Sequence, residues 1–175
     1  VHGIDGAGQR NDLKAAAEGV GVVFLFGHIV YAHRKAVGGA QRLHSGKADV
    51  FLQGKLFDLV AQKYPDKDTA AFINSYMASK TRKSIDEAKA YVNTMSAPEL
   101  WDYFCKTEDF TLKDGKAIEG FMPDWIGEFY AYYQWYYNLP SSEVVKKVPV
   151  AFLEKAYGGL HDLELDLAVQ KVGEV

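Results

Sequence analysis

Few residues of this 175-residue chain have the types and spacing that chemistry requires. Glu128 is an acid within a very aromatic segment, and His161 is followed directly by Asp162. General acid–base catalysis needs a titratable group within reach of the reacting atom, and burial raises the pKa of a carboxyl group. Adjacency in sequence does not place His161 and Asp162 for a relay, and a corner at a helix start, packed on the core, is the preferred explanation of the pair. Glu128, with tyrosine hydroxyls near it, is the stronger candidate for acid–base work.

The sequence offers no metal or cofactor motif, and we expect neither. Cys105 is the single cysteine, so it can form no intramolecular disulfide and no cysteine-based metal site. His28 and His33 are five residues apart and have no identifiable third ligand. The glycine-rich start of the chain has neither of the spacings that are typical of phosphate-binding loops.

Lys80, Arg82 and Lys83 are the one basic cluster after residue 47 and are a candidate anion contact. A solvated helix face is the simpler interpretation, because Asp86 and Glu87 follow at once. Residues 1–47 carry six basic and three acidic residues, or +3, and the remainder carries fourteen and twenty, or −6. An acidic main body argues against nucleic acid as the default partner, since phosphate binding needs clustered Lys and Arg.

The stretch 121–138 must position Glu128, and it holds nine of the chain's twenty-four aromatic residues. Proline near its start and apolar residues three and four apart predict a helix that other helices surround. We expect its large rings, including Trp125, Tyr132 and Tyr136, to pack in the core, and Glu128 and Trp135 to lie on a narrower strip. Trp and Tyr are favoured interface anchors, so any exposed ring would indicate a binding surface. The candidate interaction or pocket residues are Trp125, Glu128, Tyr132, Trp135 and His161.

From Ala48 onward the apolar spacing predicts an all-α fold, a helical bundle around this central aromatic helix. Asp66 or Asp68, Ser96 with Glu99, and Ser141 or Ser142 are predicted helix starts. Gly158 is predicted to end a helix, and residues 162–172 fit a helix better than a strand. Other helical patterns cover residues 50–64 and 79–94. Asp114-Gly115 predicts one small β-hairpin over residues 110–118.

Residues 1–46 differ from the rest, with nine of the sixteen glycines and four of the five histidines in residues 1–47. We expect residues 1–46 to form a poorly ordered or non-native extension, and residues 48–175 to form a single helical domain. The apolar run 20–32 is interrupted by His28 and is too short to span a membrane. A cytoplasmic location is expected.

Several stretches resemble a family of small uncharacterised bacterial proteins: FLQGKLFDLVA, FINSYM, GFMPDWIGEFYAYYQWYYNLPSSEVVKKVP and YGGLHDLELDLAV. The resemblance begins near residue 50 and spans roughly 125 residues. Members of that family are often encoded beside a small ADP-ribosyltransferase-like protein, in what looks like a toxin–antitoxin arrangement. The resemblance implies a cytoplasmic accessory or neutralising partner of a toxin-like enzyme, and it carries over no catalytic residue.

Three functions remain open from the sequence. The first is a non-enzymatic domain that binds a partner protein through an acidic or aromatic surface. The second is an enzyme or small-ligand protein whose pocket lies beside the aromatic helix and uses Glu128 or His161. The third is a weak DNA-binding regulator, which needs Lys80, Arg82 and Lys83 to share a face with Lys146 and Lys147.

Overall fold

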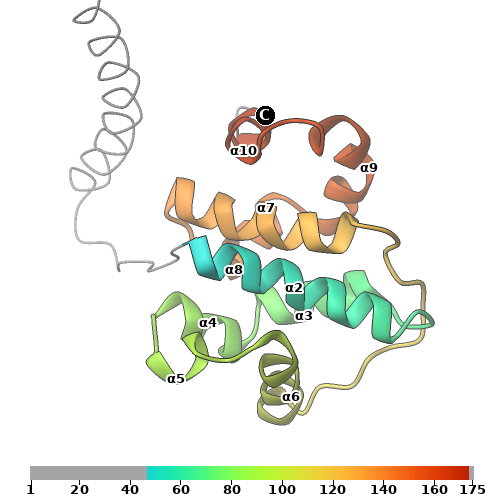
Figure 1. Ribbon diagram of the computed structural model, residues 1–175, viewed down its shortest axis with the longest axis vertical. Coiled ribbons are helices and arrows are strands. Elements are labelled where there is room, and N and C mark those ends of the chain that lie inside the picture. Colours follow the sequence, from blue (N-terminus) through green and yellow to red (C-terminus); the bar gives the residue numbers. More distant parts are fainter. Residues whose placement is uncertain (1–46, 174–175) are drawn as a thin grey trace, which may run out of the picture. The chain divides into compact units, whose positions relative to one another are not determined.

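The computed structural model describes residues 47–173, with side chains from Phe51 onward. Over this range the chain is helical and forms no β-strand, which confirms the all-α prediction (Figure 1). No helix in this part of the chain is long and apolar enough to cross a lipid bilayer. The extension predicted over residues 1–46 lies outside the described residues. The helices are α2 Lys47–Lys63, α3 Thr69–Met77, α4 Lys80–Asp86, α5 Ala90–Asn93, α6 Ala97–Glu108, α7 Met122–Tyr137, α8 Ser141–Lys147, α9 Val150–Leu160 and α10 Leu165–Gly173.

Several helix starts follow the predicted capping chemistry. The Asp68 carboxylate accepts a hydrogen bond from the Ala71 amide at 2.8 Å and begins α3. Ser96 and Glu99 form the predicted capping box at the start of α6. Each cap satisfies backbone N–H groups that have no partner within the first turn of the helix. The C-terminal segment is also helical, as α10, and not a strand.

Three predicted boundaries are wrong. Residues 79–94 form two helices, because Ala88 has a φ of 56° and turns the chain between α4 and α5. Pro140, not a serine, is the residue before α8, and Ser141 instead bonds to Asp86. Helix α9 continues through Gly158 to Leu160, since that glycine has a conformation that the helix accepts.

The predicted hairpin over residues 110–118 does not form. The Asp68 amide donates to the Lys113 carbonyl at 3.0 Å, and the Gly115 amide donates to the Asp66 carbonyl at 3.1 Å. The backbone groups that would close a hairpin therefore pair with the turn between α2 and α3. Gly115 is needed there, because a Cβ at this position would lie 2.6 Å from the Asp68 Cβ.

Helix α7 lies against α2, and the two run in opposite directions (Figure 1). Gly54 of α2 and Gly127 of α7 meet where they cross: a Cβ on Gly127 would lie 2.6 Å from the Gly54 Cα. The Gln53 side chain donates to the Gly127 carbonyl at 3.0 Å at the same crossing. Two glycines thus allow the helix backbones to approach closely and fix how α7 is rotated against its neighbour.

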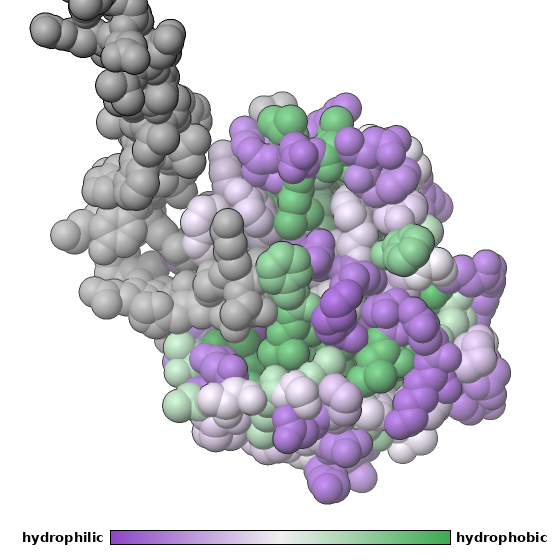
Figure 2. All heavy atoms as spheres, in the orientation of Figure 1, coloured by the Kyte–Doolittle hydropathy of each residue, from purple (hydrophilic) through white to green (hydrophobic). Residues whose placement is uncertain are grey.

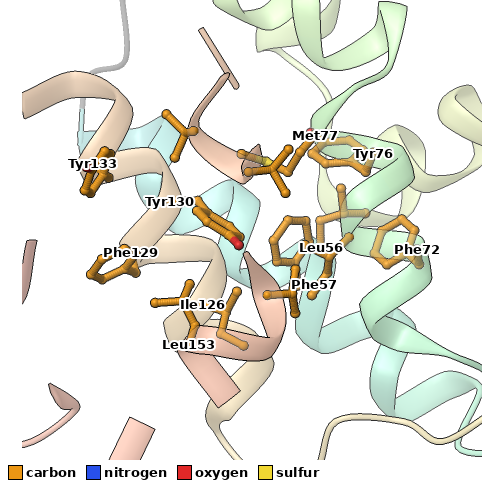
Figure 3. Packing of buried hydrophobic residues seen from close by; sticks show 14 of the residues in the cluster. Leu56, Phe57, Phe72, Tyr76, Met77, Ile126, Phe129, Tyr130, Tyr133 and Leu153 are labelled. Carbon is orange, nitrogen blue, oxygen red and sulfur yellow. The ribbon is translucent and has the colours of Figure 1, made fainter. Parts of the chain in front are cut away.

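The core between α2, α3 and α7 contains many aromatic rings. Figure 3 shows Phe57 of α2 beside Phe72 and Tyr76 of α3, with Tyr130 of α7 on the other side. Phe57 meets Phe72 and Tyr76 edge to face, with ring centroids 5.8 and 5.7 Å apart. Such pairs add about 0.5–1.5 kcal/mol to the stabilisation from burial alone. The core therefore holds α2, α3 and α7 in a fixed relation.

Candidate functional site

Helix α7 has a buried face and a half-exposed face, and the candidate residues lie on the second. Trp125, Glu128, Tyr132 and Trp135 are all partly exposed and follow one another at steps of three or four residues. Residues at these steps are neighbours on a helix surface. Together with Asp124 they form what we call the outer strip. The buried face consists of Pro123, Ile126, Gly127, Phe129, Tyr130, Ala131, Tyr133 and Gln134.

The orientation of α7 corrects the expected burial of its rings. Trp125, Tyr132 and Tyr136 were expected in the core but are only partly buried. Ala131, three residues after Glu128, is fully buried. The close glycine crossing turns Gly127 toward α2, and Trp125, Tyr132 and Tyr136 lie toward the sides of the contact. The apolar period correctly predicted the burial of Phe129 and Tyr133, but not the partial exposure of Trp125, Tyr132 and Tyr136.

Glu128 lies in the middle of the outer strip. In the part of the chain that the structure describes, its carboxylate accepts no hydrogen bond and forms no ion pair within 4 Å. Partial burial raises the pKa of Glu128, the negative charge of Asp124 raises it further, and Lys55 partly opposes both effects. An unpaired carboxylate that is partly removed from water is costly to ionise, and a cation that approached it would be favourable.

Asp124 and Lys55 form the ion pair that joins this strip to α2. The Lys55 ammonium lies 2.8 Å from Asp124 Oδ2, and its side chain is 62 % exposed. The other carboxylate oxygen, Oδ1, is buried and has no hydrogen-bond partner among the described residues. Gly54 makes room for this oxygen, because a Cβ at that position would collide with the carboxylate. The site therefore has three charged groups close together, of which two are acidic.

Ring contacts run along the outer strip. Tyr132 and Trp135 have ring centroids 5.2 Å apart, and burial raises the pKa of Tyr132, so its hydroxyl stays protonated. At the other end, Trp125 meets Tyr157 of α9 edge to face at 5.3 Å. Tyr157 in turn stacks on His161 at 4.3 Å. His161 thus lies at the exposed end of this aromatic row.

The His161 imidazole is held by local contacts. Its Nδ1 lies 2.7 Å from the Tyr157 carbonyl oxygen, which fits a donating N–H, and its Nε2 lies 3.3 Å from Asp162 Oδ1. Each contact is with a residue within one helical turn. The described contacts give this histidine no nucleophile to activate. They fit the corner at the end of α9 better than a catalytic relay.

A shallow groove lies on α2, and it includes Lys55, which also pairs with Asp124. It has a volume of about 500 Å³ and is lined by Lys55, Asp58, Leu59, Gln62, Lys63 and Ala97. Glu128 and His161 do not line this groove. The two groups that could do acid–base work therefore do not converge on it, as an enzyme site would require.

The three residues of the predicted basic cluster differ in exposure: two are on the surface and one is buried. Lys80 and Lys83 are exposed, and Lys83 lies 3.8 Å from Glu87. The Arg82 side chain is only 4 % exposed and points inward, where its Nη2 donates to Gln134 Oε1 at 2.8 Å and lies 3.3 Å from Asp86. Arg82 is therefore a structural residue, and the cluster does not present three charges to an anion.

Asp86 is the centre of a buried network that sequence reasoning missed. Its Oδ1 accepts from Gln134 Nε2 at 3.0 Å, and its Oδ2 accepts from the Ser141 amide and hydroxyl at 3.0 and 2.8 Å. These bonds join α4, α7 and α8. The sequence could have predicted the Arg82–Asp86 ion pair, because oppositely charged residues four apart pair on a helix.

Metal and thiol chemistry have no support in the described residues. No three of their His, Cys, Asp or Glu side chains are placed to hold a metal ion. Burial raises the pKa of the Cys105 thiol, and the charge of Asp102 adds to the effect. A raised pKa leaves less of the reactive thiolate at neutral pH.

On the face of the molecule drawn in Figure 2, hydrophobic and hydrophilic side chains are interspersed over α2 and α7. Two large apolar side chains near the beginnings of these helices are exposed, Phe51 of α2 at 56 % and Phe121, next to the start of α7, at 84 %. Phe51 is one turn from Lys55, and Phe121 is seven residues before Glu128, so both lie on the faces that carry the site. Two exposed aromatic side chains thus lie near the beginnings of the two helices that carry Lys55 and the outer strip.

Searches of protein-family models, curated proteins and solved structures find no match to this chain. The arrangement of residues on α2 and α7 therefore carries the functional argument.

Proposed function

We propose that this chain is a protein-interaction domain that binds a partner protein through the outer strip of α7. The observation that supports this most strongly is the position of Glu128. It is a partly buried carboxylate that pairs with no other residue of the described range, and it lies beside half-exposed Trp and Tyr side chains. An acidic group and large rings on one rigid helix face have the composition of a binding surface.

The energetics of interfaces favour such a surface. Trp and Tyr bury large areas and have few rotatable bonds, so they lose little entropy when a partner covers them. The Gly54–Gly127 crossing holds α7 firmly against α2, so the strip is organised before binding. A preorganised surface binds more tightly because less ordering is required on association.

The resemblance to bacterial proteins encoded beside ADP-ribosyltransferase-like proteins gives the proposed partner. We infer that the partner is the toxin-like enzyme of such a pair, and that this chain is its antitoxin-like or accessory subunit in the cytoplasm. A ligand-binding or catalytic use of Glu128 is the second candidate, because its raised pKa is suited to proton transfer. The lining of the groove on α2 does not support that candidate.

The test is co-expression with the product of the adjacent gene. We expect the two proteins to co-purify and to elute together in size-exclusion chromatography. Trp135→Ala should weaken the complex about tenfold or more, as truncation of an aromatic anchor does. Tyr91→Ala is the matched control, since Tyr91 is an exposed ring on α5. No complex with the wild-type chain, or equal losses from both variants, would refute the proposal.

A further inference from the structure

We infer that the partner contributes an arginine side chain, which binds Glu128 and stacks on the rings beside it, in competition with Lys55. This inference rests on the proposed function and names the chemistry of its partner. It follows from the charges around Glu128, the rings next to it and the resident ammonium group.

The charges around the strip favour a cation. The negative charges of Asp124, Asp58 and Glu128 all act on Lys55, so this part of the surface has three carboxylates for one ammonium group. Their net charge is −2, one positive against three negative. The ion pair of Lys55 uses only Asp124 Oδ2, and Glu128 has no ion pair with a described residue. A second cation would remove this imbalance.

The rings decide between arginine and lysine. Tyr132 is one turn after Glu128, and its ring lies 5.2 Å from that of Trp135. Trp125 is one turn before Glu128 on the same face. A guanidinium group can form two parallel hydrogen bonds to a carboxylate and stack on an aromatic face. A lysine ammonium is a strongly hydrated point charge and stacks less well.

Lys55 acts as the resident cation in the free protein. Its ammonium is largely exposed and raises the electrostatic potential at Glu128, which opposes a second positive charge. An exposed ion pair of this kind contributes little to stability and can be broken readily. Removing the Lys55 charge should therefore strengthen binding of an arginine. Loss of an ordinary interface contact would weaken binding instead.

The test uses blocked hexa-arginine and hexalysine peptides with the full chain, followed by calorimetry and by tryptophan fluorescence. Hexa-arginine should bind more tightly than hexalysine, and Lys55→Gln should tighten its binding about twofold to fivefold, the range for an exposed ion pair. Glu128→Gln should weaken binding by at least a similar factor. Glu143→Gln is the control, because it removes the same charge from an exposed site on α8.

Equal binding of the two peptides would overturn the inference, as would equal effects of Glu128→Gln and Glu143→Gln, because both indicate diffuse charge attraction. No effect, or weakening, from Lys55→Gln would also overturn it. Failure of the proposed function is a separate result. A stable complex with the adjacent gene product that is unaffected by Lys55→Gln and Glu128→Gln would leave the proposed function standing and reject the arginine.

Discussion

Replacement of Gly127 by alanine tests whether the glycine crossing holds α7 in place. The added Cβ would lie 2.6 Å from the Gly54 amide nitrogen and 2.7 Å from the Gln53 carbonyl carbon, which are backbone atoms that cannot rotate away. Overpacking of this kind costs about 1–3 kcal/mol. Alanine in a helix recovers about 0.5–1 kcal/mol relative to glycine. The expected net loss in the free energy of unfolding is about 2 kcal/mol, near the upper end of the difference between the two ranges because the added Cβ meets backbone atoms.

The matched control is the same substitution in α9. Nothing lies within 4 Å of a Cβ added to Gly158, so Gly158→Ala should stabilise the protein by about 0.5–1 kcal/mol. Urea denaturation followed by circular dichroism measures both changes, with the slope used to check that the denatured states are comparable. Gly127→Ala that is neutral or stabilising would refute the crossing as the device that orients α7. So would a loss of equal size from Gly158→Ala.

Two other variants test the buried network around Asp86 and the partly buried carboxylate of Glu128. Asp86→Asn should lower the free energy of unfolding by about 3 kcal/mol, because the buried Arg82 loses its counter-charge. The new amide group would also turn a donor toward the donors of Gln134 or Ser141. A loss under about 1 kcal/mol in a denaturant titration would contradict the network. Glu128→Gln should raise the thermal midpoint at pH 7 but not near pH 4. Because the pKa of Glu128 is raised in the folded state, the carboxyl lowers stability as pH rises through that pKa and has no effect below its ordinary value. A midpoint increase of equal size at both pH values would reject this reasoning.

Local chemistry in the sequence predicted many of the helices. Ser96 and Glu99 satisfy each other's backbone at the start of α6, and Asp68 caps α3, because each interaction spans three residues. Such signals need no knowledge of the rest of the fold. The hairpin prediction failed for the opposite reason. Asp114-Gly115 is a good turn, but its backbone bonds go to residues 66–68, which are distant in sequence.

The sequence suggested the candidate residues, but it could not give the geometry that relates them. Glu128 and Trp135 were assigned to the exposed side of α7, and both are partly exposed. The role of Lys55 was missed, because the ion pair with Asp124 depends on how α2 and α7 cross. Burial of Arg82 was missed likewise, since its partner Gln134 lies fifty-two residues away on another helix.

The measurement that bears most directly on the outer strip is a calorimetric titration of the adjacent gene product into wild-type chain, Tyr132→Ala and Tyr91→Ala. Thermal unfolding of each variant would first confirm that it is folded at the titration temperature. We expect the dissociation constant to rise about tenfold or more for Tyr132→Ala and to stay within about twofold of wild type for Tyr91→Ala. Unchanged affinity in a folded Tyr132→Ala variant would contradict the assignment of this strip as the binding surface.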